Sequence, residues 1–303
     1  MTEFVLLGIS NQSELQALFF TVFLLIFLFI LLGNMLICVV TGLHHTLQTP
    51  MYFFLQNLSF LDICFTSVTI PQMLINLMAE KKTISFVGCA MQMFFYLFLG
   101  AAVCYLLAIM SYDRYLAICH PLHYMRLMTR KASLLLVSGC WAIGFIVSLG
   151  QTLLIFTLPF CSSEIINHFF CDVLPLLRLH CTSPYIKDIE RILTIFLVFV
   201  TPFLLILLSY ILIIVAFWNV TTMEGRKKAL GTCSSHLVSV ILFYSTAMFT
   251  YLRPSSNYSP NSDKHQSLIY TVFSPMFNPI IYSFRNKEVK GAFMRIWEKK
   301  PFE

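Results

Sequence analysis

The sequence predicts an all-α membrane protein, a bundle of seven transmembrane helices followed by a short C-terminal amphipathic helix. Of the 303 residues, only 11% are charged and 58% are hydrophobic, whereas about a quarter of the residues of a soluble domain are charged. In addition, Asp113, Arg114 and Tyr115 close a long apolar run, a placement that suits a membrane face and not a soluble core. Since each span needs about 20 apolar residues, this chain has room for seven or eight spans and for no second domain.

Seven apolar windows lie between charged or proline-rich breaks, within a single domain that covers residues 1–303. The windows cover about 15–41, 51–78, 89–119, 132–156, 188–217, 228–252 and 265–284. Four prolines interrupt them and are candidate kinks, because a carbonyl freed in lipid must be satisfied by neighbouring groups. They are Pro71, Pro202, Pro275 and Pro279.

The basic residues are unevenly divided between the two sides of the membrane. The loops after the second, fourth and sixth windows are nearly neutral, whereas the other side holds most of the lysines and arginines. The positive-inside rule places that side in the cytosol, with the C-terminus, and the N-terminus outside the cell. This topology explains the net charge of +6 without a nucleic acid partner. The sequon Asn11-Gln12-Ser13 then predicts glycosylation of Asn11.

The tail after Arg285 has helical spacing of apolar residues. Val289, Phe293 and either Ile296 or Trp297 recur on one face, opposite several basic residues. This pattern predicts an amphipathic helix over about 286–298 that lies on anionic membrane lipid.

Four of the ten cysteines fall on the predicted outer side, where disulfides are stable. Cys89 begins the third window, and Cys161, Cys171 and Cys181 lie in the long loop after the fourth. Four cysteines allow three pairings. We favour Cys89 with Cys171 and Cys161 with Cys181, because tying the loop to a helix end shapes a pocket mouth. A zinc site with His168 and His180 fits no standard spacing, so we expect no metal.

A few polar residues lie within the spans, where they are costly unless they are paired. Asp62 in the second span has two candidate partners, Asn34 and Asn278, and with Pro279 and Tyr282 they form a polar layer that can act as a two-state element. A purely structural clamp is the alternative. Arg114 has three candidate partners, on its own helix and on other helices. These partners favour a conformational switch over the alternative, in which the Arg114 side chain snorkels to the inner membrane interface. They are Asp113, Tyr210 and Tyr282.

A ligand pocket is expected in the outer half of the bundle, between the third, fifth, sixth and seventh spans. Its candidate residues carry no charge, so the predicted ligand is small, neutral and mostly apolar, oriented by one or two hydroxyl groups. Tyr251 and Tyr244 are the strongest candidates. The full set is Tyr96, Leu97, Gly100, Ala101, Cys104, Thr194, Ile195, Val198, Tyr244, Ala247, Met248, Tyr251, Leu268 and Thr271.

Motifs along nearly the whole chain carry a family resemblance. They are Leu6-Leu7-Gly8, Gly33-Asn34, Pro50-Met51-Tyr52-Phe53-Phe54-Leu55, Leu58-Ser59-Phe60-Leu61-Asp62, Asp113-Arg114-Tyr115, Lys228-Ala229, Thr232-Cys233-Ser234-Ser235-His236-Leu237 and the segment from Pro275 to Asn286. With them, and with its three-cysteine outer loop, the chain resembles the olfactory receptors of the rhodopsin-like G protein-coupled family.

The resemblance implies an odorant receptor that activates a stimulatory, olfactory-type G protein and raises cyclic AMP, in the plasma membrane of the cilia of sensory neurons. It implies that outward movement of the sixth span frees Arg114 for the G protein, with Lys227, Lys228 and His236 contributing. Val103 stands where many family members carry a glutamate, which puts a sodium ion near Asp62 in doubt.

Other classes of protein are less well supported. The sequence has no zinc-ligand helix, serine elbow or phosphate loop, so we expect neither an enzyme nor a cofactor. A small-molecule transporter or channel of the plasma membrane is the alternative, and it calls for a conducting polar lining or repeat symmetry.

Overall fold

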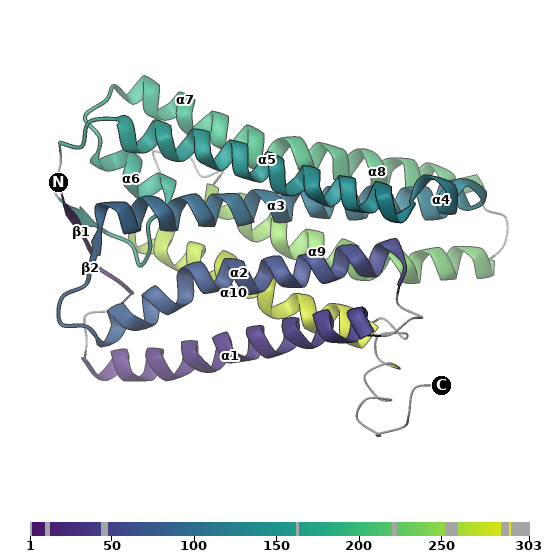
Figure 1. Cartoon of the computed structure of the whole chain (residues 1–303), viewed down its shortest axis with the longest axis horizontal. Helices are drawn as coiled ribbons and strands as arrows, with labels where there is room; N and C mark the ends of the chain where they lie inside the picture. The colour runs from purple at the N-terminus through teal and green to yellow at the C-terminus, as the bar shows by residue number, and fades with distance from the viewer. Residues whose placement is uncertain are drawn as a thin grey trace.

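The computed structural model describes residues 2–9, 13–43, 48–161, 164–219, 223–251, 260–285 and 291, and it shows a helix bundle (Figure 1). Among these residues, six helical segments are long and apolar enough to cross a membrane. The long helices are α1 (Ser13–Leu43), α2 (Pro50–Met78), α3 (Phe86–Cys119), α5 (Arg130–Thr157), α7 (Pro184–Ile195) continued by η2 (Phe196–Val200) and α8 (Thr201–Asn219), α9 (Met223–Tyr251) and α10 (Pro260–Arg285).

The shorter elements mark the two ends of the bundle. We call one end the sheet end, because β1 (Glu3–Leu6), β2 (Thr83–Ser85) and β3 (Ile165–Ile166) lie there, close to α6 (Val173–Leu179). The opposite end is the α4 end, where α4 (Pro121–Leu127) lies (Figure 1). Asn11 and the amphipathic helix expected at about 286–298 lie outside the described residues, apart from Gly291.

Several helices begin before the apolar windows do. The helix of the fifth window starts at Pro184 and that of the seventh at Pro260, whereas the windows predict about 188 and 265. Apolarity marks the part of a helix that suits lipid, not the point where backbone hydrogen bonding begins. Proline favours the first helical turn, where its missing N–H costs nothing, so it starts these helices in the polar region.

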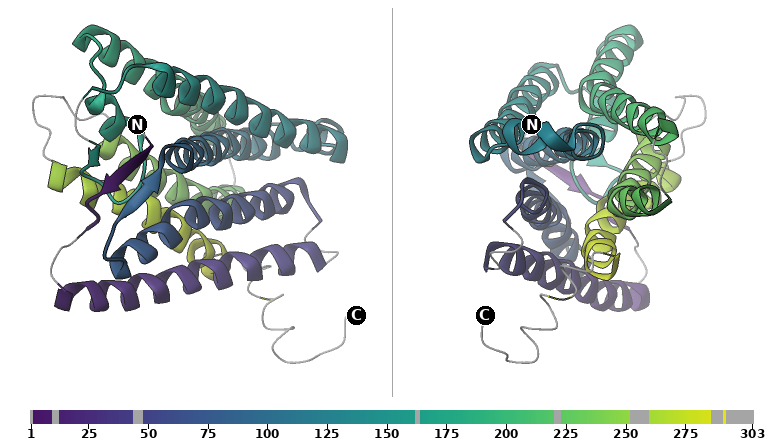
Figure 2. Two further views of the ribbon diagram at one scale, coloured as in Figure 1. Left: turned by 60° about the vertical axis from the view of Figure 1, so that its left-hand side comes forward. Right: turned by 90° about the vertical axis from the view of Figure 1, so that its right-hand side faces the viewer.

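Helix α3 is the centre of the bundle and packs against α2, α5, α8 and α9 (Figures 1 and 2). Its contact with α5 depends on Gly144, where an added Cβ would lie 2.8 Å from the carbonyl oxygen of Phe98. At Gly33 an added Cβ would lie 3.1 Å from Cβ of Pro279, which brings α1 close to α10. Small residues therefore set the backbone separation, as is typical of packing in lipid.

Pro202 reshapes the fifth transmembrane segment. Because Pro202 has no N–H, the preceding turn widens into the π-helical η2, in which the N–H of Thr201 bonds the carbonyl of Phe196. The carbonyl of Leu197 thereby loses its α-helical partner. The hydroxyl of Tyr105 on α3 donates to it at 2.9 Å, so a neighbouring helix satisfies the irregular turn.

The prolines of α10 are accommodated in a similar way. Pro279 cannot donate to the carbonyl of Pro275 four residues earlier. The side chain of Asn34 on α1 donates to that carbonyl at 3.1 Å and to the carbonyl of Ile30 at 3.0 Å. Asn34 therefore joins α1 to the irregular stretch of α10.

A three-stranded sheet covers part of this end of the bundle. Strand β1 is central and pairs antiparallel with β2 and parallel with β3, with Phe4 opposite Ile84 and Val5 opposite Ile165. Phe4 and Leu6 are fully buried there. Two disulfides, Cys89–Cys171 and Cys161–Cys181, each join Cα atoms 5.5 Å apart, and these are the pairs favoured from the sequence.

Candidate functional site

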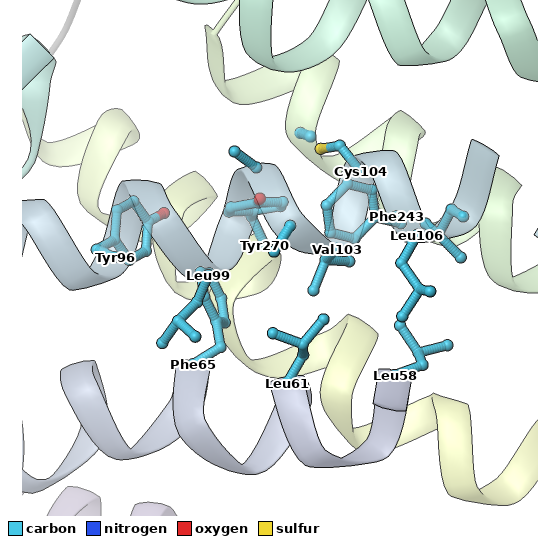
Figure 3. Close-up of a cluster of buried hydrophobic side chains, with 14 of the residues drawn as sticks. Leu58, Leu61, Phe65, Tyr96, Leu99, Val103, Cys104, Leu106, Phe243 and Tyr270 are labelled. Carbon is cyan, nitrogen blue, oxygen red and sulfur yellow. The ribbon is translucent and has the colours of Figure 1, made fainter. Parts of the chain in front are cut away.

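Aromatic side chains fill the half of the bundle nearest the sheet end. We call Phe65, Tyr96, Phe199, Tyr251 and Tyr270 the aromatic cluster. Phe65 stacks on Tyr96 with ring centroids 5.0 Å apart, and Phe199 stacks on Tyr251 at 5.0 Å. Tyr270 meets Tyr251 edge-on at 6.0 Å. Figure 3 shows Phe65, Tyr96 and Tyr270 converging from α2, α3 and α10, so the cluster connects the helices predicted to surround a ligand.

A chain of hydroxyl and carboxylate groups lies at the edge of this cluster. The hydroxyl of Tyr251 lies 3.1 Å from that of Tyr96 and 3.2 Å from Oδ2 of Asp172. As a carboxylate, Asp172 accepts only, so Tyr251 donates to Asp172 and accepts from Tyr96. All three side chains are buried. The chain therefore couples α3 and α9 to the loop before α6, and it places one negative charge beside a region predicted to have none.

The structure places most of the predicted ligand residues on the inner side of the helices. Eleven of the fourteen are buried, and Ile195, Met248 and Leu268 are partly buried. Tyr96, Cys104, Val198, Ala247 and Tyr251 share one core cluster with Ala101 and Tyr244. The buried hydroxyl of Tyr244 faces the thiol of Cys104, a weak hydrogen-bond partner that is itself a predicted ligand residue.

Three predicted ligand residues are engaged elsewhere. Leu97 packs in a second cluster with Phe4 and Leu176, because α3 contacts several elements and neighbouring positions on it face different partners. The hydroxyl of Thr194 donates to the carbonyl and to Oε1 of Glu190 at 3.0 and 3.1 Å. Thr271 bonds the carbonyl of Ser267, within its own helix.

Sequence reasoning missed Asp172, Phe199 and Tyr270. Phe199 lies within the π-helical turn η2, which shifts the helical spacing by one residue, and Pro202 is the sequence signal for that shift. Asp172 adjoins Cys171, whose disulfide to Cys89 fixes the loop against α3. A loop residue next to a predicted disulfide is therefore the signal for Asp172.

Hydrogen bonds to α3 also hold the loop that carries Asp172. Gln92 on α3 accepts from the N–H of Cys171 at 3.0 Å and donates to the carbonyl of Val68 on α2 at 3.0 Å. His168 is fully buried, and its Nδ1 accepts from the N–H of Phe170 at 3.4 Å. Burial, and then the charge of Lys264, lower the pKa of His168 from 6.5 to about 3.

The polar layer lies between the aromatic cluster and the α4 end. Asn278 donates to Oδ2 of Asp62 at 2.8 Å and accepts from the hydroxyl of Ser239. Asn34, the other expected partner of Asp62, bonds backbone carbonyls instead, because Pro279 leaves one of them free. The layer thus joins α2, α9 and α10 directly.

A small void of about 10 Å³ adjoins Asp62. Val103 lines it with Phe243 and Tyr270 (Figure 3), so no second carboxylate faces Asp62 across it. A void of this size holds about one water molecule.

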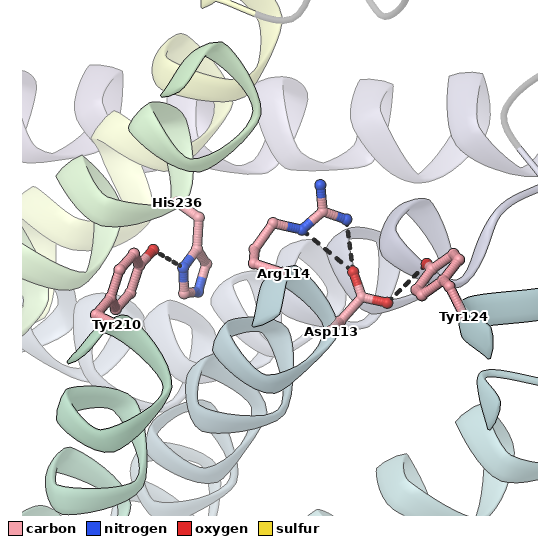
Figure 4. Close-up of polar contacts among 5 residues, drawn as sticks. All are labelled: Asp113, Arg114, Tyr124, Tyr210 and His236. Atoms are coloured by element: carbon pink, nitrogen blue, oxygen red, sulfur yellow. Dashed lines mark hydrogen bonds and ion pairs between the residues drawn. The ribbon is translucent and has the colours of Figure 1, made fainter. Parts of the chain in front are cut away.

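Arg114 is held on its own helix near the α4 end (Figure 4). Its Nη2 lies 2.5 Å from Oδ2 of Asp113, and its Nε lies 3.2 Å from the same oxygen. Tyr124 on α4 donates to Oδ1 of Asp113 at 2.8 Å. Burial and the charge of Asp113 raise the pKa of Tyr124 above its usual value, so it keeps the proton that it donates.

The other switch candidates lie around Arg114 without bonding it. The hydroxyl of Tyr210 lies 2.8 Å from Nδ1 of His236, which joins α8 to α9 (Figure 4). The buried hydroxyl of Tyr282 interacts with Ser239 on α9. Tyr115 faces away, with its hydroxyl 3.1 Å from Nε2 of His120. In this arrangement Arg114 pairs with Asp113 and not with Tyr210 or Tyr282.

Comparison with known proteins identifies the family. Residues 23–300 match the family described as olfactory receptor. The chain belongs to the olfactory receptor family. It is similar to human olfactory receptor 10A7, with 50% identity over 99% of this chain and 95% of the relative, and to mouse olfactory receptor 5AR1, with 46% identity over 99% and 97%.

The fold is that of rhodopsin. Squid rhodopsin superposes with a TM-score of 0.75 over 97% of this chain and 89% of its own, at 18% identity. This olfactory receptor is therefore a multi-pass membrane protein with a seven-helix bundle, in which α10 supplies a helix beside the six apolar spans found among the described residues. Family membership does not favour the transporter or channel interpretation.

Proposed function

We propose that this chain is an odorant receptor that binds a small, mostly apolar volatile in the half of the bundle nearest the sheet end. The observation that carries the proposal is the hydrogen-bonded chain from Tyr96 through Tyr251 to Asp172, which closes one side of the aromatic cluster. Burial of an apolar ligand supplies the affinity, at about 25 cal/mol per Å². Hydroxyl groups such as that of Tyr244 supply its orientation.

The proposed topology places the sheet end outside the cell and the α4 end in the cytosol. The disulfides at the sheet end suit an oxidising compartment, and Arg126, Arg130 and Lys131 lie at the α4 end, in agreement with the positive-inside rule. Glycosylation of Asn11, an amphipathic helix at 286–298 and residence in sensory cilia belong to the same proposal.

The α4 end is the proposed coupling surface for a stimulatory G protein that raises cyclic AMP. The ion pair with Asp113 restrains Arg114 in the present arrangement. Movement of α9 away from α8 would separate His236 from Tyr210 and open the region around Arg114. Leu122 and Met125 on α4 are 93% and 75% exposed, and sequence reasoning did not single them out. Exposed apolar side chains suit a protein partner.

A cyclic AMP reporter assay with a panel of volatiles tests the proposal, in cells that express the full chain and an olfactory-type stimulatory Gα subunit. Wild type should respond to a subset of volatiles, and Arg114→Ala should abolish the response while antibody staining shows unchanged surface expression. Equal responses in both would contradict the coupling role of Arg114. Volatile-dependent ion flux in liposomes that contain only the purified chain would favour the channel alternative.

A further inference from the structure

A cavity of about 440 Å³ lies at the α4 end, well apart from the proposed odorant site. Its walls come from α1, α2, α4, α5 and the loops between them, including Gln56, Met128 and Leu134. No described side chain of α8 or α9 lines it, although those helices hold Tyr210 and His236 beside Arg114. The cavity therefore lies on the α1, α2 and α5 side of the α4 end, away from Tyr210 and His236, and it shares only Met125 with the exposed face of α4. Its volume is in the range of small-molecule sites.

The lining changes from apolar to polar across the cavity. Phe53, Met128 and Leu134 form the apolar part of the wall. The side chain of Leu134 is 48% exposed, so this part of the wall is open to the surroundings of the bundle. Thr49 and Arg130 are exposed polar rim residues at the starts of α2 and α5. An amphipathic occupant fits such a site, with its apolar part along the helices and its polar part at the rim.

The rim is positively charged. Among the described residues, Arg130 is the one charged residue in the lining, and it takes part in neither of the two ion pairs found there. Lys131 follows it on α5, and no aspartate or glutamate is found in the part of the lining that the structure describes. The start of α2 adds a partial positive charge from the backbone N–H groups of its first turn, which the side chain of Thr49 does not cap. These charges match an anion.

We propose that this cavity binds the headgroup of an anionic glycerophospholipid of the inner leaflet, with the phosphate against Arg130 and the start of α2 and the acyl chains along α1 and α5. Basic pockets between transmembrane helices on the cytosolic side are suited to such headgroups. The proposal uses the topology proposed above but neither the odorant nor the G protein. Its test therefore stays separate from that of the odorant response.

Native mass spectrometry of the full-length receptor tests the proposal after reconstitution in nanodiscs of equal parts phosphatidylserine and phosphatidylcholine with matched acyl chains. Wild type should retain phosphatidylserine in preference to phosphatidylcholine. Arg130→Gln should lower that preference by about fivefold, the effect of one basic residue near an anionic leaflet. Thr49→Trp, which fills the rim at an exposed position without removing a helix cap, should also lower it.

Arg126→Gln is the matched control, because it removes the same charge from the same end of the bundle and Arg126 does not line the cavity. Its preference should stay within about twofold of wild type. Equal losses in Arg126→Gln and Arg130→Gln would show general surface attraction and overturn the proposal. So would a phosphatidylserine preference that survives both Arg130→Gln and Thr49→Trp, or displacement of phosphatidylserine by cholesterol in a second nanodisc composition that contains it.

Discussion

The hydroxyl of Tyr251 lies 3.2 Å from Oδ2 of Asp172, which joins the end of α9 to a loop that a disulfide fixes on α3. A hydrogen bond to a charged group contributes about 1.5–3 kcal/mol. Any odorant that tightens or breaks this contact therefore acts directly on α9, the helix that carries His236 near its middle.

Tyr251→Phe should raise the half-maximal concentration of a hydrogen-bonding odorant by about tenfold, which corresponds to 1.4 kcal/mol, with surface expression retained. The measurement is a cyclic AMP dose response, combined with Asp172→Asn in a double-mutant cycle. A coupling energy near zero would mean that the two residues act independently. Tyr112→Phe, on an exposed side chain of α3, is the control.

Tyr105→Phe should destabilise the receptor by about 1 kcal/mol. The substitution removes the donor to the carbonyl of Leu197, which the π-helical turn before Pro202 leaves without its usual partner. Thermal unfolding of purified protein measures the effect, again with Tyr112→Phe as control. Equal melting temperatures for Tyr105→Phe and wild type would show that the carbonyl finds another donor.

The sequence predicted the bundle well and the site only in part. Apolar runs locate the spans because a helix in lipid must present apolar side chains. Helical spacing also predicted that Tyr96, Cys104 and Tyr251 face the interior of the bundle, where the structure places them. Spacing did not indicate that Leu97 packs against Phe4 and Leu176, since α3 contacts several elements and periodicity does not say which neighbour each face meets. It also passed over Asp172, because the position of a loop side chain depends on contacts distant in sequence, here those of Cys89 and Gln92.

Receptor stability should fall as the pH drops below about 6.5, in part because of His168. Its folded pKa is lowered to about 3 from 6.5, by burial and then by Lys264. The unfolded chain therefore binds a proton that the folded chain does not between these values. The contribution of neutral His168 to the free energy of unfolding is fully present above pH 6.5. It falls on acidification by up to about 1.4 kcal/mol per pH unit.

The variant His168→Asn isolates this effect, because an asparagine oxygen can replace Nδ1 as acceptor for the N–H of Phe170. Melting temperatures of the purified variant should fall less steeply than those of wild type between pH 6.5 and 5. His180 also has a lowered pKa, from burial and Lys187, so some slope should remain. Parallel curves for the two proteins would exclude His168 as a source of acid sensitivity.

Asp113→Asn should raise cyclic AMP in the absence of odorant. The substitution removes the charge that holds Arg114 on its own helix and keeps an acceptor for the hydroxyl of Tyr124. If it weakens the restraint by about 1.4 kcal/mol, the ratio of active to resting receptor rises tenfold. Basal reporter signal, normalised to surface expression, measures this. Tyr115→Phe is the control, because the hydroxyl of Tyr115 bonds His120 and not Asp113. Basal signal that rises equally in both variants, or in neither, would show that the Asp113–Arg114 pair does not set the resting state.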